Sequence, residues 1–543
     1  MGEGRVISRK QSIRFGLILL VLLLIEAVLT LTPNGLAITG HEGDLLHMLD
    51  ASLRIVAGEL PHLDFMTPIG YLGFAPVAFW LSLGFMVGKA TLLANLSLSA
   101  LLLPVIWWVG ATRFSFAQAL TFGVFILMTM TALIYGGGDT ATSLSMFYNR
   151  WAWGVTFLIL GTVLFPMRVN IAERWLPPLI IAAGMTALAM LKVTFFVPLV
   201  PVVLLILLAQ KQAALAIQSV AIGLAFGGAL LLWFGLDYFI AYFHDLLAVT
   251  SDVSGRSAPV DSFTQIIASP HSILASLILL ASIVLYRKSG KMLQGLVLLL
   301  LAPAFTYITY QNWGNDPKWL VLVILYLWVN LPERDERWVF NLPARQSILT
   351  IIIVAGTVIF PSVISLATSP IRAVFTSKEE FLKMPISEGV ADIWLPEFRI
   401  LHAMKRETIE GFPSPFSEDE RVVINGFEFP ECSSNESISP MATKIAQELE
   451  AIDFVRGKPV LAADILNVSW MFGDIERVQG AAPWYYGDTA GVENADYLMV
   501  PLCPINANMR RQMVMQFIEG SYGLNEVYRS NLFVLYEVSK PTE

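Results

Sequence analysis

The run FGLILLVLLLIEAVLTLT, which occupies residues 15–32, decides the class of fold. It contains one charged side chain, Glu26, and a helix that spans a membrane needs about 20 mostly apolar residues. The same composition extends along the chain, since 55% of the 543 residues are apolar and 14% are charged, against about 25% in soluble proteins. The mean hydropathy is +0.64. These values exclude an ordinary soluble enzyme, and the net charge of −8 argues against a nucleic-acid partner. They predict a polytopic α-helical membrane protein in contact with the lipid bilayer.

Twelve apolar runs qualify, or nearly qualify, as membrane spans. They lie at 15–32, 69–88, 91–111, 115–134, 151–167, 176–191, 194–210, 213–235, 272–286, 291–309, 318–331 and 346–367. The run 69–88 contains Gly70, Pro76 and Gly84, which suits a re-entrant or surface helix better than a crossing. We therefore expect about eleven spans.

The distribution of Lys and Arg supports this count. If the run 69–88 does not cross, fourteen basic residues of the membrane region lie on the side of the N-terminus and six on the other side. If it crosses, the numbers become nine and eleven. Because cytoplasmic loops are enriched in Lys and Arg, the first arrangement is favoured. It predicts a multi-pass protein with a cytoplasmic N-terminus and an extracytoplasmic C-terminal domain.

The chain changes in composition near residue 370. Residues 1–369 carry a net charge of +3 and residues 370–543 a net charge of −11, and the second part has the size of one domain. Its apolar patterns predict a small α/β domain. The expected elements are a helix over 441–452, buried strands at 459–466 and 497–501, a helix at 505–518, and a closing pair at 524–529 and 532–538. Cys432 and Cys503 form one disulfide in an oxidising compartment or remain two thiols, and both alternatives are open.

The first outer loop, residues 33–68, is rich in ionisable groups. Glu42 and Asp44 form an E-x-D pair, and residues 44–57 predict an amphipathic helix that Asp44 would cap. Pro61-His62-Leu63-Asp64 follows, where Asp64 is explained equally well as a turn residue. A carboxylate beside the bilayer is partly desolvated, which raises its pKa and suits it to act as a base.

These motifs resemble the first outer loop of the GT-C glycosyltransferases, a superfamily of multi-span membrane enzymes that includes the protein mannosyltransferases and the lipid A aminoarabinose transferases. The residues that carry the resemblance are Glu42-Gly43-Asp44, Gly58-Glu59-Leu60-Pro61 and Asp64-Phe65 through Pro68, with a further match at Leu191-Lys192-Val193-Thr194. The resemblance covers roughly residues 10–370. The chain has no second D-x-D and no W-W-D motif, which argues against the oligosaccharyltransferases.

The resemblance implies transfer of a sugar from a polyprenyl-phosphate carrier to an envelope acceptor of unknown identity, at the outer face of a bacterial plasma membrane. It implies that Asp44 is the base, with Glu42 as second choice, and that Asp64 positions the acceptor or binds a cation. A divalent metal is possible, but the spacing of His41, His47 and His62 matches no standard metal motif.

Other outer loops offer ligands for a phosphate. Asp139 follows three glycines, Arg150 begins the next span, and Lys192 and Lys318 lie on the face that otherwise has few cations. Snorkelling at the membrane interface explains these cations equally well. The residues assigned to substrate binding are Asp64, His62, Asp139, Tyr148, Arg150, Lys192, Asn315, Asp316 and Lys318.

Two other functions fit the same composition. An envelope-lipid transporter or flippase would show internal repeats with paired broken helices, and the chain shows no such repeat. An O-antigen ligase or polymerase would have a large outer loop between late spans and usually lacks a folded C-terminal domain.

Overall fold

The computed structural model describes residues 7–134, 136–138, 140–168, 175–251, 266, 268–312, 316–333, 343–386, 390–402, 404–407, 421–436, 438–486 and 489–540. The chain forms two compact units. The first comprises Met1–Pro33, Leu92–Trp233 and Asp261–Phe375, and the second comprises Asn34–Thr91, Phe234–Val260 and Thr376–Glu543.

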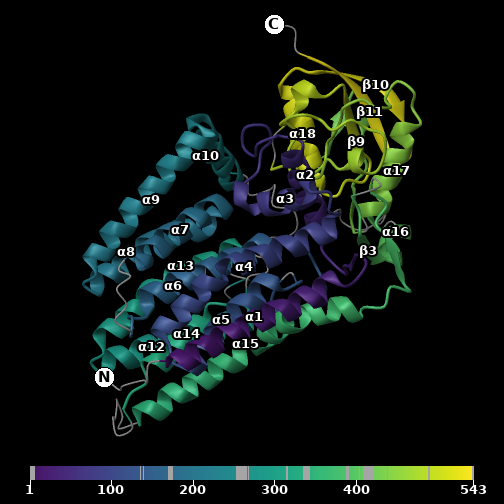
Figure 1. Ribbon diagram of the computed structural model, residues 1–543. Helices are drawn as coiled ribbons and strands as arrows, with labels where there is room; N and C mark the ends of the chain where they lie inside the picture. The colour runs from purple at the N-terminus through teal and green to yellow at the C-terminus, as the bar shows by residue number, and fades with distance from the viewer. Residues whose placement is uncertain are drawn as a thin grey trace. The chain divides into compact units, whose positions relative to one another are not determined.

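The first unit is helical (Figure 1). Its helices are α1 (Arg9–Leu31), most of α4 (Val87–Arg113), α5 (Phe116–Thr131), α6 (Phe147–Leu164), α7 (Leu176–Leu191), α8 (Val193–Ala209), α9 (Ala213–Phe234), α12 (Pro270–Lys288), α13 (Met292–Gln311), α14 (Leu320–Val329) and α15 (Ala344–Phe375). Within the described residues six of them, α1, α4, α9, α12, α13 and α15, are long and apolar enough to cross a membrane. The chain is therefore a helical membrane protein, and every predicted run outside 69–88 coincides with a helix.

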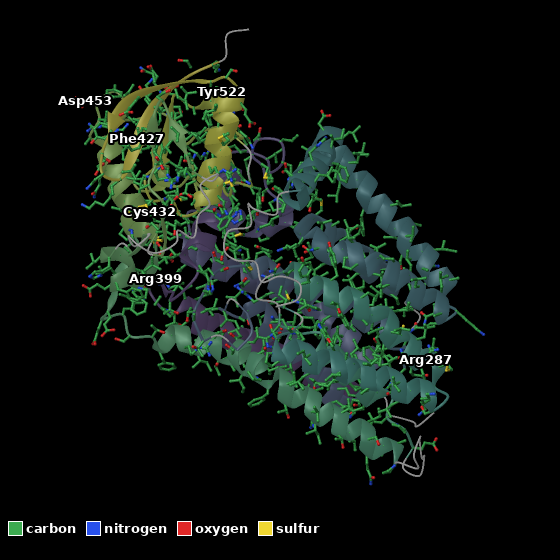
Figure 2. The ribbon with its side chains drawn as sticks, turned by 180° about the vertical axis from the view of Figure 1, so that it is seen from behind. Arg287, Arg399, Phe427, Cys432, Asp453 and Tyr522 are labelled. Carbon is green, nitrogen blue, oxygen red and sulfur yellow. A yellow bond between two sulfur atoms is a disulfide. The ribbon has the colours of Figure 1, made fainter. Side chains whose placement is uncertain are left out.

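Small residues let the apolar helices approach closely. The ring of Phe15 on α1 is fully buried, and a Cβ atom on Gly110 of α4 would lie 2.5 Å from its Cε1. A Cβ atom on Gly123 of α5 would lie 3.0 Å from the same ring. Where no hydrophobic effect drives association, such close packing is a main source of helix–helix stability in membranes. Helix α12 ends with two cations, Arg287 (labelled in Figure 2) and Lys288. Positive charge is favourable in the last turn of a helix.

The run 69–88 contains a short 3₁₀ turn, Tyr71–Gly73, and the eight-residue helix α3, Ala75–Ser82. Eight helical residues rise about 12 Å, well short of a bilayer core of about 30 Å. This length fits the prediction that the segment does not cross. Helix α4 then begins at Val87, and the Asp392 carboxylate accepts hydrogen bonds from the backbone N–H groups of Gly88 at 2.6 Å and Lys89 at 3.0 Å.

The second unit contains a four-stranded sheet in the order β10-β11-β9-β8. Its strands are β8 (Val460–Ala462), β9 (Tyr497–Pro501), β10 (Gly523–Arg529) and β11 (Phe533–Ser539). Strands β8 and β9 are parallel, and the other pairs are antiparallel. With α17 (Ile438–Glu450) and α18 (Ala507–Glu519), these elements confirm the predicted order of helices and strands. The core of this region includes Leu449, Val460 and Leu535.

A second sheet joins the first outer loop to the C-terminal residues. Strand β1 (Leu36–Ala37) pairs in parallel with β3 (Ile393–Pro396), which also pairs with β2 (Phe381–Lys383) in antiparallel fashion. The smaller pairs are β4 (Met404–Glu407) with β7 (Cys432–Glu436) and β5 (Val423–Ile424) with β6 (Phe427–Glu428), and α16 (Glu397–Leu401) lies between β3 and β4 along the chain. The loop thus folds as part of this unit.

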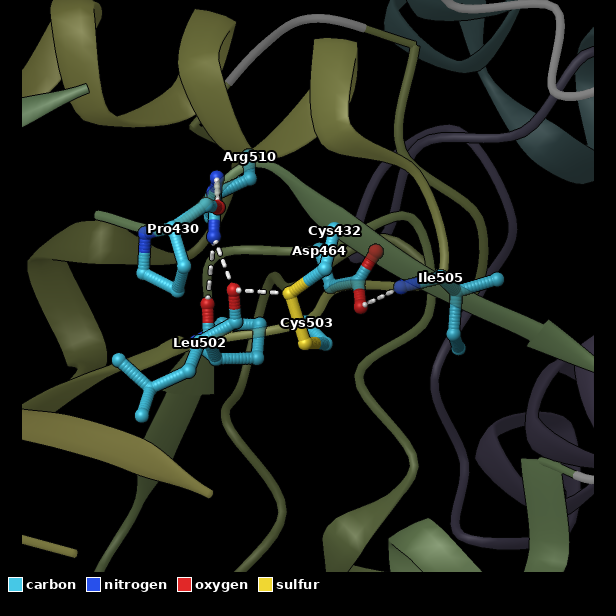
Figure 3. The surroundings of a disulfide bond; sticks show 8 residues. Pro430, Cys432, Asp464, Leu502, Cys503, Ile505 and Arg510 are labelled. Atoms are coloured by element: carbon cyan, nitrogen blue, oxygen red, sulfur yellow. Dashed lines mark hydrogen bonds between the residues drawn. A yellow bond between two sulfur atoms is a disulfide. The ribbon is translucent and has the colours of Figure 1, made fainter. Parts of the chain in front are cut away.

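Cys432 and Cys503 form a disulfide, with their Cα atoms 4.9 Å apart (Figure 3). This decides between the two alternatives that the sequence leaves open. Beside the disulfide, the guanidinium of Arg510 donates to the carbonyl oxygens of Leu502 at 2.6 Å and Pro430 at 3.1 Å. The bond to Pro430 holds the start of α18 against the segment that carries Cys432, and the bond to Leu502 holds it against the end of β9.

Candidate functional site

The E-x-D pair lies in the first turn of α2, Glu42–Val56, and its two carboxylates differ in environment. Glu42 is 3% exposed, and its Oε1 atom accepts hydrogen bonds from the backbone N–H of Ser439, at 2.5 Å, and from the Ser439 hydroxyl. Burial raises the pKa of Glu42, and the bonds from Ser439 oppose that shift. Asp44 is partly exposed. Glu42 therefore binds α2 to α17, and Asp44 is the more exposed member of the pair.

The start of α2 differs from the expectation in one respect. The helix begins at Glu42 and its N-cap residue is His41, in a left-handed conformation at φ +62°, so Asp44 is the third helical residue and not the cap. Both carboxylates still lie in the first turn, where the partial positive charge of the helix terminus favours them. Gly43 permits the close approach of this turn to α17, because a Cβ atom there would lie 3.0 Å from Ile438 Cδ1.

A cluster of ion pairs lies in the second half of the same helix and just after its end. Arg54 is fully buried and its guanidinium donates to Asp50 at 2.8 Å and to Glu59 at 3.0 Å. Arg477 of the C-terminal region also pairs with Glu59, at 2.5 Å, and Arg54 reaches the carbonyl oxygen of Val478 at 3.3 Å. The sequence motifs singled out Glu59 only as part of the resemblance and did not indicate the other members. The sequence offered one signal, which is the spacing of Asp50 and Arg54, an acidic and a basic residue four positions apart on α2.

His62 and Asp64, both assigned to substrate binding, follow α2 in the loop. The Oδ2 atom of Asp64 accepts a hydrogen bond from the backbone N–H of Leu60 at 2.7 Å, so this carboxylate closes a turn, as the alternative explanation has it. His62 is 6% exposed, and its Nδ1 atom lies 2.7 Å from Oδ2 of Asp245. The same oxygen accepts from the backbone N–H of Thr67 at 3.0 Å.

The partner of His62 lies on α10, Leu236–Ser251, a helix that the sequence analysis did not predict. The imidazole stacks on Tyr242, with ring centroids 4.1 Å apart, and meets Tyr238 edge to face at 5.2 Å. Asp245 was missed because one carboxylate in an apolar segment has no local signal. The repeated aromatic residues of LDYFIAYFHDLL, four positions apart, are the only hint that this segment has a buried face.

The first unit holds the remaining assigned residues in two groups. In one, the Nη1 atom of Arg150, which is 3% exposed, donates to the carbonyl oxygens of Ser145, at 3.1 Å, and Ile134. Its Nε and Nη2 atoms have no hydrogen-bond partner within the described part of the chain. Lys192 lies at the junction of α7 and α8 with its Nζ atom 4.7 Å from the centroid of the Tyr148 ring. Of the predicted residues, Tyr148 and Lys192 are thus in contact, and Arg150 lies two residues further along α6.

In the other group, Lys318 and Asp316 form a buried ion pair. Burial raises the pKa of Asp316, but its ion pair with Lys318 and its hydrogen bonds together outweigh burial and lower the pKa below its usual value. Asp316 also accepts from the backbone N–H of Gly137 at 3.2 Å. Through Asp316 the pair contacts the segment that contains Gly137, so Lys318 has a structural role in the folded chain. Asp139 and Asn315 lie outside the described residues.

No three His, Cys, Asp or Glu side chains gather into a metal site in the described ranges. His41, His47 and His62 therefore do not form a cluster with three ligands.

Comparisons with models of protein families, with curated proteins and with solved structures each find no match.

Proposed function

We propose that this protein is a membrane glycosyltransferase that moves a sugar from a polyprenyl-phosphate carrier to an envelope acceptor, with Asp44 as the base. The observation that supports it best is the unequal environment of the E-x-D pair. Glu42 is buried, whereas Asp44 is partly exposed in the same turn of α2. A base must reach the acceptor hydroxyl, so the greater exposure of Asp44 favours it over Glu42.

Within the first unit by itself, the proposal assigns the binding of a phosphate to two cations. Arg150 is a buried guanidinium with two nitrogen atoms that bind nothing among the described residues, and an anion would satisfy both. Lys192, stacked on Tyr148, supplies a second positive charge. Lys318 is a weaker choice because Asp316 neutralises it.

The proposal includes a topology of eleven spans with the N-terminus in the cytoplasm and the C-terminal region outside. The disulfide between Cys432 and Cys503 supports this orientation, because disulfides persist in oxidising compartments.

The test is transfer of labelled sugar from purified polyprenyl-phosphate-sugars by the full chain and by Asp44→Asn. Asn keeps the size of Asp and its place in the first turn, and a general base contributes about 10²–10⁴-fold, so we expect the rate to fall at least about 100-fold. Binding of the donor lipid should be unchanged.

Asp453→Asn is the matched control, since it removes an exposed carboxylate of the same unit away from α2. Full activity of Asp44→Asn would exclude Asp44 as the base. Absence of transfer by the native chain with every donor sugar, together with movement of the lipid across vesicles, would favour a flippase instead.

A further inference from the structure

Helix α10 presents an apolar stripe on its exposed side. Its members are Leu236, Ile240, Phe243 and Leu247, which are 62%, 47%, 59% and 47% exposed. At about 100° of rotation per residue, these four side chains fall within an arc of about 60°. Large apolar side chains in such a continuous stripe mark a surface that binds something apolar.

The opposite side of α10 is fixed by polar and aromatic contacts. Tyr238, Tyr242 and Asp245 are buried there, and His62 contacts all three. Turning the stripe inward would break the bond between His62 and Asp245 and would leave a buried carboxylate with fewer partners, which is unfavourable. The stripe is therefore held outward by the fold.

We propose that α10 is a membrane-surface helix whose apolar stripe inserts into the lipid of the outer leaflet. The chain itself indicates lipid as the occupant. Helix α9 is long and apolar enough to cross a membrane, and Gly235 alone separates it from α10. At the end of α9, Leu232 and Trp233 are 90% and 83% exposed, and tryptophan is typical of the membrane–water interface.

The composition of α10 fits an interfacial helix better than a span. It has 16 residues. Asp237 and His244 are both exposed and lie about 80–100° around the helix from Leu236, beside the apolar stripe. One apolar face, a polar flank and a length below that of a span describe a helix that lies in the plane of the interface. The bond from Asp245 to His62 then connects the bilayer surface to the loop that carries the E-x-D pair.

The experiment places an environment-sensitive fluorophore on single introduced cysteines of the full chain in phosphatidylcholine–phosphatidylglycerol vesicles. The two native cysteines form the disulfide and do not react under non-reducing conditions. The variants are two adjacent pairs, Phe243→Cys with His244→Cys and Leu236→Cys with Asp237→Cys. Each pair compares neighbouring positions about 100° apart on the helix.

We expect brominated lipids to quench the label at 243 and at 236 several-fold more than the label at 244 and at 237, and aqueous iodide to show the reverse order. Equal quenching within both pairs would overturn the proposal. Protection of the label at 243 from both quenchers would also overturn it, in favour of a protein partner or a second copy of the chain. If the variants of one pair do not fold, the other pair tests the proposal.

Discussion

At the scale of one residue, Asp464 is a buried carboxylate of the C-terminal region that backbone N–H groups stabilise. It is 6% exposed, and its carboxylate accepts hydrogen bonds from the backbone N–H groups of Ile465 at 2.7 Å, Ile505 at 2.6 Å and Asn506 at 3.0 Å. Figure 3 shows the bond to Ile505 beside the disulfide. Burial nevertheless raises the pKa of Asp464 to about 6. The three bonds therefore offset only part of the desolvation of the carboxylate.

This shift predicts a pH dependence with a definite sign. The folded protein binds the proton of Asp464 more tightly than the unfolded chain, where the pKa is 3.8. The contribution of this group to the free energy of unfolding is thus largest below about pH 4 and falls by up to about 3 kcal/mol as the pH rises to about 6. Asp464→Asn should remove that slope. Unfolding of the full chain in detergent, measured from pH 4 to 7, checks it, and parallel curves for variant and native protein would refute it.

Glu42 provides a second prediction about a single side chain. Glu42→Gln keeps an oxygen that accepts from Ser439 and removes a buried charge, so we expect unfolding stability equal to that of the native protein or higher. Ser439→Ala leaves the carboxylate with one donor fewer and should cost about 1–3 kcal/mol. Thermal unfolding of both variants measures this. A large loss of stability in Glu42→Gln would mean that the charge itself holds α2 to α17.

At the scale of elements, α2 depends on the ion cluster of Asp50, Arg54 and Glu59. Arg54→Met keeps the apolar bulk of the side chain but leaves the buried Asp50 carboxylate without its hydrogen-bond donor, while Glu59 keeps its ion pair with Arg477. We expect a loss of about 3–5 kcal/mol, as for other broken buried pairs. The double variant Asp50→Asn with Arg54→Met should recover part of it. Hydrogen exchange of α2 in the full chain is the measurement, and an unchanged exchange rate in Arg54→Met would show that the cluster adds no stability.

The elements that the sequence predicted well are those with a strong local pattern. Long apolar runs gave helices, and β9 was expected at 497–501, where the structure has it. Helix α10 and strand β1 were not predicted. The apolar residues of α10 lie both on its buried face and in its exposed stripe, so the sequence shows no clear helical period of apolar residues. Strand β1 has two residues, which form a strand only because β3 pairs with them.

The sequence predicted only those residues of the candidate site that stand out in a local pattern. Local spacing singled out Glu42, Asp44, His62 and Arg150. It did not indicate Ser439, Asp245 or Arg477, because each of these meets its partner through a contact between distant segments. Such partners decide how deeply a carboxylate is buried, which is why the sequence ranked Asp44 and Glu42 but did not show that Glu42 is the buried member of the pair.

At the scale of the whole molecule, the span count gives a prediction about topology. With eleven crossings, a C-terminal reporter that is active only outside the cytoplasm should be active. A fusion that ends at Lys89 should also report outside, because helix α3 rises about 12 Å and does not cross. A cytoplasmic signal at Lys89 would contradict the assignment of residues 69–88 and would reverse every later loop.

The contact between Arg54 and Val478 joins residues that are 424 positions apart, and this has a consequence for biosynthesis. At about 5–20 residues per second, roughly 20–80 s pass between the synthesis of the first partner and that of the second. During that interval the first loop has left the ribosome while β3, Ser439 and Arg477 do not yet exist. The first loop therefore spends that interval without the contacts to Ser439 and Arg477 that it makes in the folded chain.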